Sequence, residues 1–202
     1  MITQAGRLAT FAPVSPVDAE LARITTELES RGFAQTFFER LDLTYDETAA
    51  QRIRAACEDK PSSKAALELT ELVDKDGITI VQDEACMEDG RDFVRPIVDI
   101  LFRDSSRARE KWSAYALNCY ETGGHFGEHR DSIGATVLIV SVTGHRELSI
   151  GEQPKVERLT MPPGSITLLD AEHDPVHAVR CTEGPSISVV LDVPDMLRSS
   201  YR

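Results

Sequence analysis

A histidine and an aspartate two residues apart, His129 and Asp131, form the pair with the clearest chemical potential in this chain. In an extended strand, residues i and i+2 point to the same face, so the imidazole and the carboxylate would project together. A second histidine from elsewhere would complete two histidines and one carboxylate on one side of a metal ion. That set leaves coordination positions open and is associated with non-haem Fe(II) sites that handle oxygen.

The third ligand is expected on a late strand, and two histidines compete for the role. His177 begins the β run His177-Ala178-Val179, whereas His173 lies in the loop before it. A strand holds a ligand more rigidly than a loop does, so His177 is preferred. The other two histidines, His125 and His145, adjoin glycine turns and are interpreted as surface or supporting residues.

The second half of the chain is rich in short β runs. Strands are expected at 113–120, 135–142, 147–150, 156–160, 165–169, 177–181 and 187–193, with turns at Gly123-Gly124, Thr143-Gly144, Gly151, 162–164 and Gly184-Pro185. Many short strands at this spacing favour a sandwich, a barrel or a jelly roll. The open mouth of a jelly roll is a natural site for a small ligand.

The first half, residues 1–112, is predicted to be mainly helical support. Expected elements are a helix from Ser15-Pro16 to Gly32, a strand at 33–38, a helix from the capping box Thr44-x-x-Glu47 to about Cys57, a helix at 65–73, a strand at 78–81 and a helix at 92–103. Pro96 would then fall in the first turn of its helix, where proline is tolerated. The whole chain, 1–202, is expected to form a single domain.

Composition and net charge make some classes of function less favourable than others. The chain has 202 residues and a formal net charge of −12, with no Lys/Arg-rich segment. Nucleic-acid binders usually present a basic face, so nucleic acid is disfavoured as the main substrate. No apolar run is long enough for a membrane span and the N-terminus lacks signal-peptide features, so a cytoplasmic protein with no membrane partner is expected. The four cysteines form no CxxC pair and are expected to be reduced, buried thiols.

Residues 113–193 resemble the double-stranded β-helix, a jelly roll, of the Fe(II)/2-oxoglutarate-dependent oxygenases. In the AlkB-like branch, an Asn-x-Tyr pair precedes a glycine-containing turn and the His-x-Asp motif, and here that pair is Asn118 and Tyr120. The run from Gly123 through the His-x-Asp motif is similar to the prolyl-hydroxylase-like branch. Met161-Pro162-Pro163-Gly164-Ser165 resembles the turn and strand that lead to the distal histidine.

The resemblance implies an α+β fold, with a jelly-roll core at 113–193 buttressed by the N-terminal helices. It implies Fe(II) bound by His129, Asp131 and His177, which would be the catalytic centre. It also implies 2-oxoglutarate as cosubstrate, hydrogen-bonded through its carboxylates to Asn118 and Tyr120.

One feature of that family is missing. The family usually carries an arginine or lysine on the last core strand to pair with the far carboxylate of 2-oxoglutarate, and here that position falls at Ser186 or a neighbour. A second arginine of the AlkB-like branch falls near Asp192 and is also missing.

A dicarboxylate in a dry pocket needs a partner, for which a bidentate arginine is the usual solution. Arg180 is the preferred replacement, although only a bulge or twist would turn it to the face of His177. Arg146 and Arg130 are alternatives.

The resemblance implies a dioxygenase that hydroxylates, or otherwise oxidises, a C–H bond of a small molecule, an amino acid or a peptide. Tyr115, Trp112 and Phe126 are candidates for lining its pocket. The carboxylate at Asp131 argues against the halogenating branch, which keeps that position small. Two alternatives stay open: a cupin-like metal oxygenase that does not use 2-oxoglutarate, and a non-catalytic jelly-roll binding module. A nucleic-acid demethylase would be a version of the first function.

Overall fold

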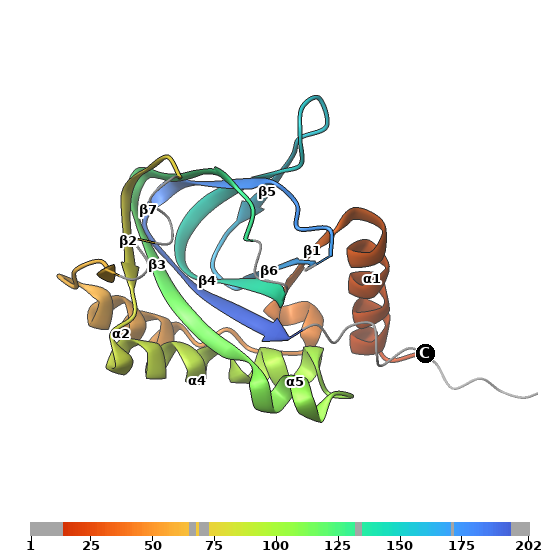
Figure 1. Ribbon diagram of the computed structural model, residues 1–202. Helices are drawn as coiled ribbons and strands as arrows, with labels where there is room; N and C mark the ends of the chain where they lie inside the picture. The colour runs from red at the N-terminus through yellow and green to blue at the C-terminus, as the bar shows by residue number, and fades with distance from the viewer. Residues whose placement is uncertain (1–13, 65–67, 69–72, 132–134, 171, 195–202) are drawn as a thin grey trace, which may run out of the picture.

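The computed structural model describes residues 14–64, 68, 73–131, 135–170 and 172–194. A curved antiparallel sheet forms its centre, and helices cover one side of that sheet (Figure 1). The elements are α1 (Pro16–Arg31), β1 (Phe33–Phe37), a 3-10 helix η1 (Phe38–Leu41), α2 (Glu47–Cys57), β2 (Lys75–Val81), α4 (Glu84–Leu101), α5 (Ser106–Lys111), β3 (Ser113–His129), β4 (Ala135–Ile150), β5 (Glu157–Met161), β6 (Ser165–Leu169) and β7 (His177–Pro194).

The strands pair in the order β1-β6-β4-β7-β3-β2, and β5 pairs with β4. The long strand β4 takes part twice: residues 137–140 lie between β6 and β7, whereas 146–150 lie between β5 and β7. Because β3, β4 and β7 each continue past a bend, their two halves build two facing layers. This is the α+β architecture with a double-stranded β-helix that the sequence predicted.

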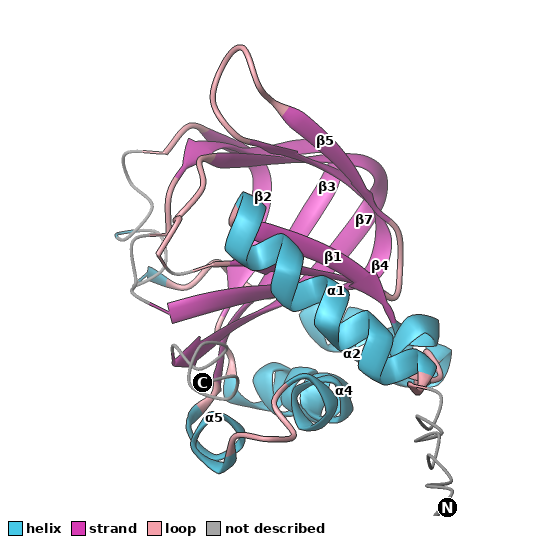
Figure 2. Ribbon diagram, turned by 90° about the vertical axis from the view of Figure 1, so that its right-hand side faces the viewer, coloured by secondary structure: helices cyan, strands magenta, loops and turns pink. Residues whose placement is uncertain are grey.

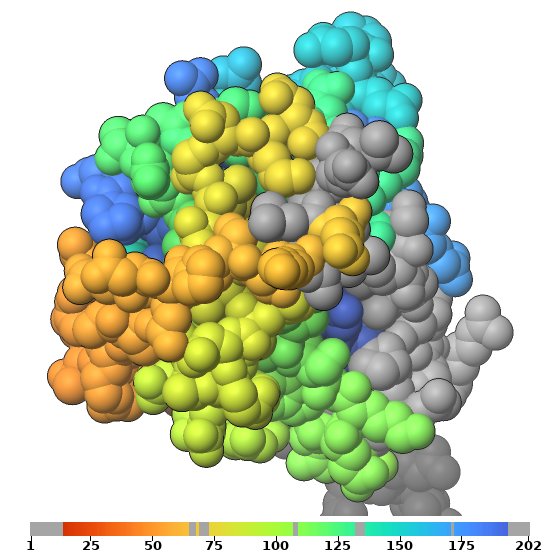
Figure 3. All heavy atoms as spheres, turned by 60° about the vertical axis from the view of Figure 1, so that its left-hand side comes forward, coloured from red at the N-terminus to blue at the C-terminus, as the bar shows by residue number. Residues whose placement is uncertain are grey.

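Alternation along the strands separates two cores. On β4, Leu138 and Val140 point towards the helices, while Val137 and Ile139 point into the roll. Helix α1 runs beside β1 (Figure 2), and α2 and α4 pack side by side on the outer face (Figure 3). The helices therefore bury one face of the sheet and leave the inside of the roll to line a pocket.

The predicted helices were partly right. Helix α1 begins after the N-cap Ser15 and ends at Gly32 in the left-handed region, as predicted. Helix α2 is capped by Asp46, whose side chain accepts a hydrogen bond from the Ala49 amide, so the prediction of a Thr44 cap was wrong. The strand predicted at 33–38 is present as β1, whereas α5 was not predicted. The predicted helix at 65–73 falls largely outside the described residues.

Helix α4 corrects a second prediction. It begins at Glu84, after the N-cap Asp83, rather than near Asp92, so Pro96 lies in the helix interior. The buried stripe that includes Cys86, Met87 and Phe93 extends the helix backwards, because an amphipathic face is stabilised by packing on the sheet. None of the described helices combines the length and the hydrophobicity that a membrane span requires. All four cysteines are free, as predicted, and three are buried.

The predicted turns at Gly123-Gly124, Thr143-Gly144 and Gly184-Pro185 are not turns between separate strands. Each lies inside one long strand, where the pairing register shifts. A β-bulge inserts an extra residue and changes which side chains face inward. The glycines therefore mark bends that fold each strand from one layer of the roll into the other.

The bend at Gly144 leaves no room for a side chain. Its φ is +66°, and an added Cβ would lie 2.6 Å from the Glu183 carbonyl oxygen and 2.7 Å from the Ser186 Cα. We expect Gly144→Ala to lower the free energy of unfolding by about 2–4 kcal/mol, because strain and a backbone clash add. Urea unfolding would measure this. The matched control is Gly123→Ala, at φ +85° with no atom within 4 Å of the added Cβ. That variant should lose only about 1–2 kcal/mol, and equal losses would contradict the steric explanation.

Candidate metal centre and its pocket

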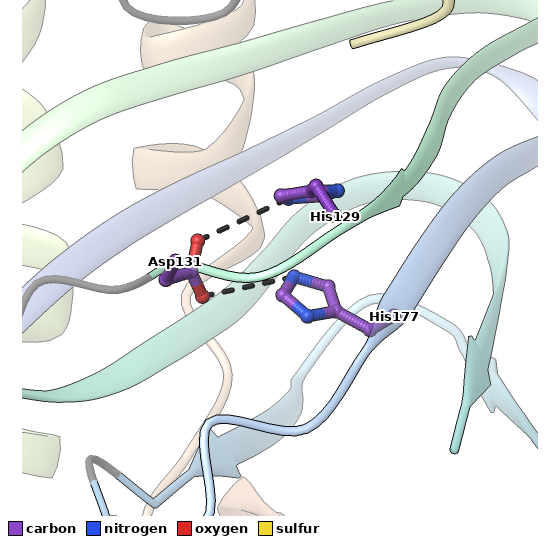
Figure 4. A group of neighbouring side chains, drawn as sticks. All are labelled: His129, Asp131 and His177. Atoms are coloured by element: carbon purple, nitrogen blue, oxygen red, sulfur yellow. Dashed lines mark ion pairs between the residues drawn. The ribbon is translucent and has the colours of Figure 1, made fainter. Parts of the chain in front are cut away.

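His129, Asp131 and His177 come together where the end of β3 lies beside the start of β7 (Figure 4). The two histidines form a cross-strand pair on β3 and β7, and Asp131 follows the end of β3. One ligand atom from each residue lies within 4.8 Å of the others. The Asp131 carboxylate oxygens lie 3.9 Å from the His129 Nε2 and 3.7 Å from the His177 Nε2.

Backbone contacts set the orientation of both imidazoles. The His129 Nδ1 lies 2.8 Å from the Gly127 carbonyl oxygen, and the His177 Nδ1 lies 3.0 Å from that of Pro175. Because a carbonyl only accepts, each Nδ1 carries the proton and each Nε2 lone pair is free. Burial, followed by the neighbouring His177, lowers the pKa of His129. The neutral imidazole, which is the form that binds metals, is therefore favoured.

The geometry fits a metal ion. Distances of 3.7–3.9 Å are too long for hydrogen bonds. Ligand atoms bound to one transition-metal ion at about 2.0–2.2 Å stand roughly 3–4 Å apart, so an ion fits between these groups with little movement. The rival histidine His173 instead contacts Asp170 at 2.6 Å, while His125 and His145 pair with Asp74 and Glu183.

A pocket extends from these three residues into the roll. Asn118 and Tyr120 line it from the same face of β3. Burial is the largest cause that raises the pKa of Tyr120 to about 12, so its hydroxyl keeps its proton. The Asn118 Oδ1 is buried and has no hydrogen-bond partner. Both groups are available to a polar ligand in the pocket.

Arg146 lines the same pocket and is 1% exposed. One guanidinium nitrogen donates to the Ser141 Oγ at 2.7 Å, whereas Nε and Nη1 have no hydrogen-bond partner among the described residues. The guanidinium carbon also lies 5.4 Å from the centre of the Tyr120 ring. Burial lowers the pKa of Arg146, and no carboxylate among the described residues pairs with it. A buried guanidinium with two free nitrogens and no counter-ion is a ready partner for an anion.

The bend in β4 explains why Arg146 faces inward. Val137 and Ile139 point into the roll before the bend, and Arg146 and Leu148 point inward after it. Before the bend the odd-numbered residues of β4 point into the roll, and after it the even-numbered residues do, because the pairing register shifts between Ser141 and Arg146. The signal was present in the sequence, since Arg146, Leu148 and Ile150 alternate with the polar residues Glu147 and Ser149.

The preferred arginine, Arg180, lies elsewhere. It is exposed and lines a neighbouring surface pocket with Glu147 and Arg158. Pairing of this part of β7 with β4 is regular from His177 to Cys181, so the bulge needed to turn Arg180 inward is absent from the described strand. Arg130, another alternative, is exposed and pairs with Glu152.

Ser186 is buried, but its hydroxyl donates to the Thr143 carbonyl oxygen at 2.7 Å. It packs against Gly144 and supports the bend of β4 rather than lining the pocket. Of the predicted lining aromatics, Tyr115 and Phe126 line the pocket, and the Phe126 ring lies 4.4 Å from that of His129. Trp112 packs instead towards the helices.

Asp192 is a neighbour of residues that line the pocket, and no role was predicted for it. It follows Ser188 and Val190 on the inward face of β7 and is paired across the sheet with Val137. Its Oδ1 is buried and accepts no hydrogen bond. Burial, followed by the charge of Asp131, raises the pKa of Asp192 to about 6. The same two carboxylates contribute to raising the pKa of Tyr115 to about 12, after burial.

Because its folded-state pKa is raised, ionised Asp192 should destabilise the metal-free protein. The resulting loss in the free energy of unfolding is absent below about pH 4, grows as the pH rises towards 6 and is constant above that. It grows in this interval because the folded state, with its higher pKa, binds more protons than the unfolded state. We expect Asp192→Asn to raise stability at pH 7.5 by about 1 kcal/mol, a value reduced for partial solvent exposure. Thermal unfolding from pH 7.5 to 4.5 should show this gain shrinking, and equal melting temperatures at pH 7.5 would contradict it.

No protein-family model and no curated protein matches the chain. Solved structures do match. A prolyl hydroxylase from Trichoplax adhaerens, in complex with a hypoxia inducible factor oxygen degradation domain peptide fragment, has a TM-score of 0.65 at 14% identity, covering 89% of this chain and 90% of its own. A prolyl-4-hydroxylase from Pseudomonas putida has a TM-score of 0.52 at 13% identity, covering 87% and 99%.

A third similar structure, the non-heme alpha ketoglutarate dependent epimerase SnoN from nogalamycin biosynthesis, has a TM-score of 0.53 at 14% identity, covering 86% of this chain and 82% of its own. These identities are too low to carry a reaction from one protein to another, but the similarity spans most of each chain. The chain has the fold of the 2-oxoglutarate- and Fe(II)-dependent oxygenases.

Proposed function

We propose that this protein is a non-haem Fe(II)- and 2-oxoglutarate-dependent dioxygenase that hydroxylates or otherwise oxidises a C–H bond of a small molecule, an amino acid or a peptide. The observation that carries the proposal is Arg146, a buried guanidinium in the same pocket as His129, Asp131 and His177, with no counter-ion in the described part of the chain. A metal site alone would not require that charge. A dicarboxylic cosubstrate would neutralise it.

Each polar group of the pocket has a role in this proposal. His129, Asp131 and His177 would hold Fe(II) through two Nε2 atoms and a carboxylate oxygen. Arg146 would pair with one carboxylate of 2-oxoglutarate, replacing the basic residue missing from the last core strand. Asn118 and Tyr120 would hydrogen-bond the cosubstrate beside it. With iron bound, molecular oxygen would be the oxidant, and 2-oxoglutarate would supply two electrons and leave as succinate and carbon dioxide.

The protein's own contribution would be orientation and exclusion of water. Phe126, Val179 and Val190 line the pocket with apolar surface, which strengthens the pairing of charges inside it. The alternative of a metal oxygenase without 2-oxoglutarate was based on the missing basic residue of the last core strand. Arg146 would supply that positive charge, so the alternative loses its support. The net charge of −12 disfavours nucleic acid. The peptide bound to the Trichoplax adhaerens enzyme supports a peptide as one possible substrate class.

The test is an anaerobic Fe(II) titration with and without 2-oxoglutarate, followed by admission of air. We expect Fe(II) binding, a visible charge-transfer absorption band only when 2-oxoglutarate is added, and slow succinate formation in air. Metal binding without the band would reject 2-oxoglutarate as cosubstrate, and absence of metal binding would reject the dioxygenase altogether.

A further inference from the structure

Beside the pocket, on the inward face of β7, lies one charge that the proposed function does not use, the carboxylate of Asp192. Its position follows from the backbone: Ser188 and Val190 line the pocket, and Asp192 is the next residue on that face of β7. Its cross-strand partner on β4, Val137, also lines the pocket. The carboxylate therefore stands beside the pocket.

Asp192 has no partner among the residues that the structure describes. No hydrogen bond reaches its buried Oδ1, and no arginine, lysine or histidine of the described part of the chain forms an ion pair with it. A partly buried, unpaired carboxylate is costly, and a second carboxylate, Asp131, lies near enough to add repulsion. A structural role would normally supply a donor from the surrounding strands, and none comes from the described residues of those strands.

The other charges of the site balance one another if the proposed function is correct, and this inference rests on it. Fe(II) and the guanidinium of Arg146 carry positive charge equal to the negative charge of Asp131 and doubly ionised 2-oxoglutarate. Asp192 remains as one uncompensated negative charge. The third component that must enter the pocket, the substrate, is the remaining source of a positive charge.

The opening contains a second group suited to a polar cation. Tyr115 is the extra residue of a bulge in β3, between Ala114 and Ala116, and it lines the pocket while remaining 36% exposed. An aromatic ring beside a carboxylate is a common environment for an ammonium or guanidinium group.

We propose that Asp192 is a specificity-determining residue that binds a cationic nitrogen of the substrate, so that the substrate class is amines or guanidines, free or in a basic side chain of a peptide. An anionic substrate, such as a phosphate ester or a nucleic acid, would be repelled by Asp192. A neutral substrate would leave its charge unpaired.

The experiment compares n-butylammonium with its neutral analogue n-butanol, by saturation-transfer NMR at about 0.15 M salt so that remote surface charges are screened. The variants are Asp192→Asn, which keeps the shape and removes the charge, and Asp99→Asn, which removes an exposed carboxylate on α4. Because the net charge is −12, this control separates the pocket from general attraction of cations.

We expect n-butylammonium to bind the wild type and Asp99→Asn alike and Asp192→Asn about tenfold more weakly, as for loss of one charge-assisted hydrogen bond. Butanol should bind all three proteins equally, and more weakly than n-butylammonium binds the wild type. With Mn(II) added, the ammonium methylene protons should relax faster than the methyl protons, which would place the cation beside the metal centre. Equal binding of both probes, or ammonium binding unchanged in Asp192→Asn, would overturn the proposal.

The two proposals can fail separately. Binding of 2-oxoglutarate to the Mn(II)-loaded protein is measured in the same samples, and Asp192→Asn should retain it. If 2-oxoglutarate does not bind the wild type, the proposed function fails whatever the amine result. If it binds but the ammonium preference is absent, only the role of Asp192 fails.

Discussion

Replacing His129 by alanine should weaken Fe(II) binding by about 100-fold or more, because removing a ligand costs at least as much as removing the groups that orient it. The remaining Asp131 and His177 would offer only two protein ligands, and the metal would lose the imidazole held at 2.8 Å by the Gly127 carbonyl oxygen. Anaerobic calorimetry with Fe(II), or with Mn(II) as a stable substitute, would measure the loss.

The matched control is His145→Ala. His145 is exposed, lies on β4 and pairs with Glu183 rather than with the three site residues. Its removal should leave metal affinity unchanged. If both variants bound metal like the wild type, His129 would have no ligand role, and if both lost it equally, the loss would reflect damage to the fold.

Replacing Arg146 by methionine should have two effects of opposite sign. Affinity for 2-oxoglutarate should fall by about 100-fold or more, since removing one partner of a buried charge pair costs several kcal/mol. Stability without cosubstrate should rise, because methionine fills similar space and removes a buried guanidinium that has two unpaired nitrogens. Metal affinity should not change. Calorimetry with 2-oxoglutarate on the Mn(II)-loaded protein and thermal unfolding of the metal-free protein measure the two effects.

Arg180→Met is the control for that experiment. Arg180 is exposed and faces away from the pocket on the neighbouring strand. We expect it to change neither 2-oxoglutarate affinity nor metal affinity. A loss of 2-oxoglutarate binding in Arg180→Met with retention in Arg146→Met would reverse the assignment and restore the arginine first favoured from the sequence.

Much of the architecture was predictable because it depends on local patterns. Ser15 and Gly32 mark the ends of α1, as a hydroxyl cap and a left-handed glycine do in general. Strand β6 was predicted at the observed bounds, Ser165–Leu169. Helix α4 was not, since its first half is stabilised by burial against β3 and β7, which no local pattern of caps or prolines reveals.

The candidate site likewise contains residues that local patterns predicted and residues that they did not. His129 and Asp131 are neighbours in the chain, and His177 is their partner through the pairing of β3 with β7, which the order of motifs suggested. Asn118 and Tyr120 share one face because they are two residues apart on a regular stretch of strand. The positions of these residues could therefore be predicted from the alternation of side chains over a few residues of strand.

Arg146 and Asp192 were decided by tertiary structure. Alternation predicts which residues share a face only while the register is unbroken, and β3, β4 and β7 each contain a bend that changes it. The sequence by itself determined the ligand types, their order and the glycines at which the strands bend. The folded sheet decided how many residues each bend adds, and therefore that Arg146 faces the pocket, that Asp192 lies on the inward face of β7 beside it, and that Arg180 faces solvent.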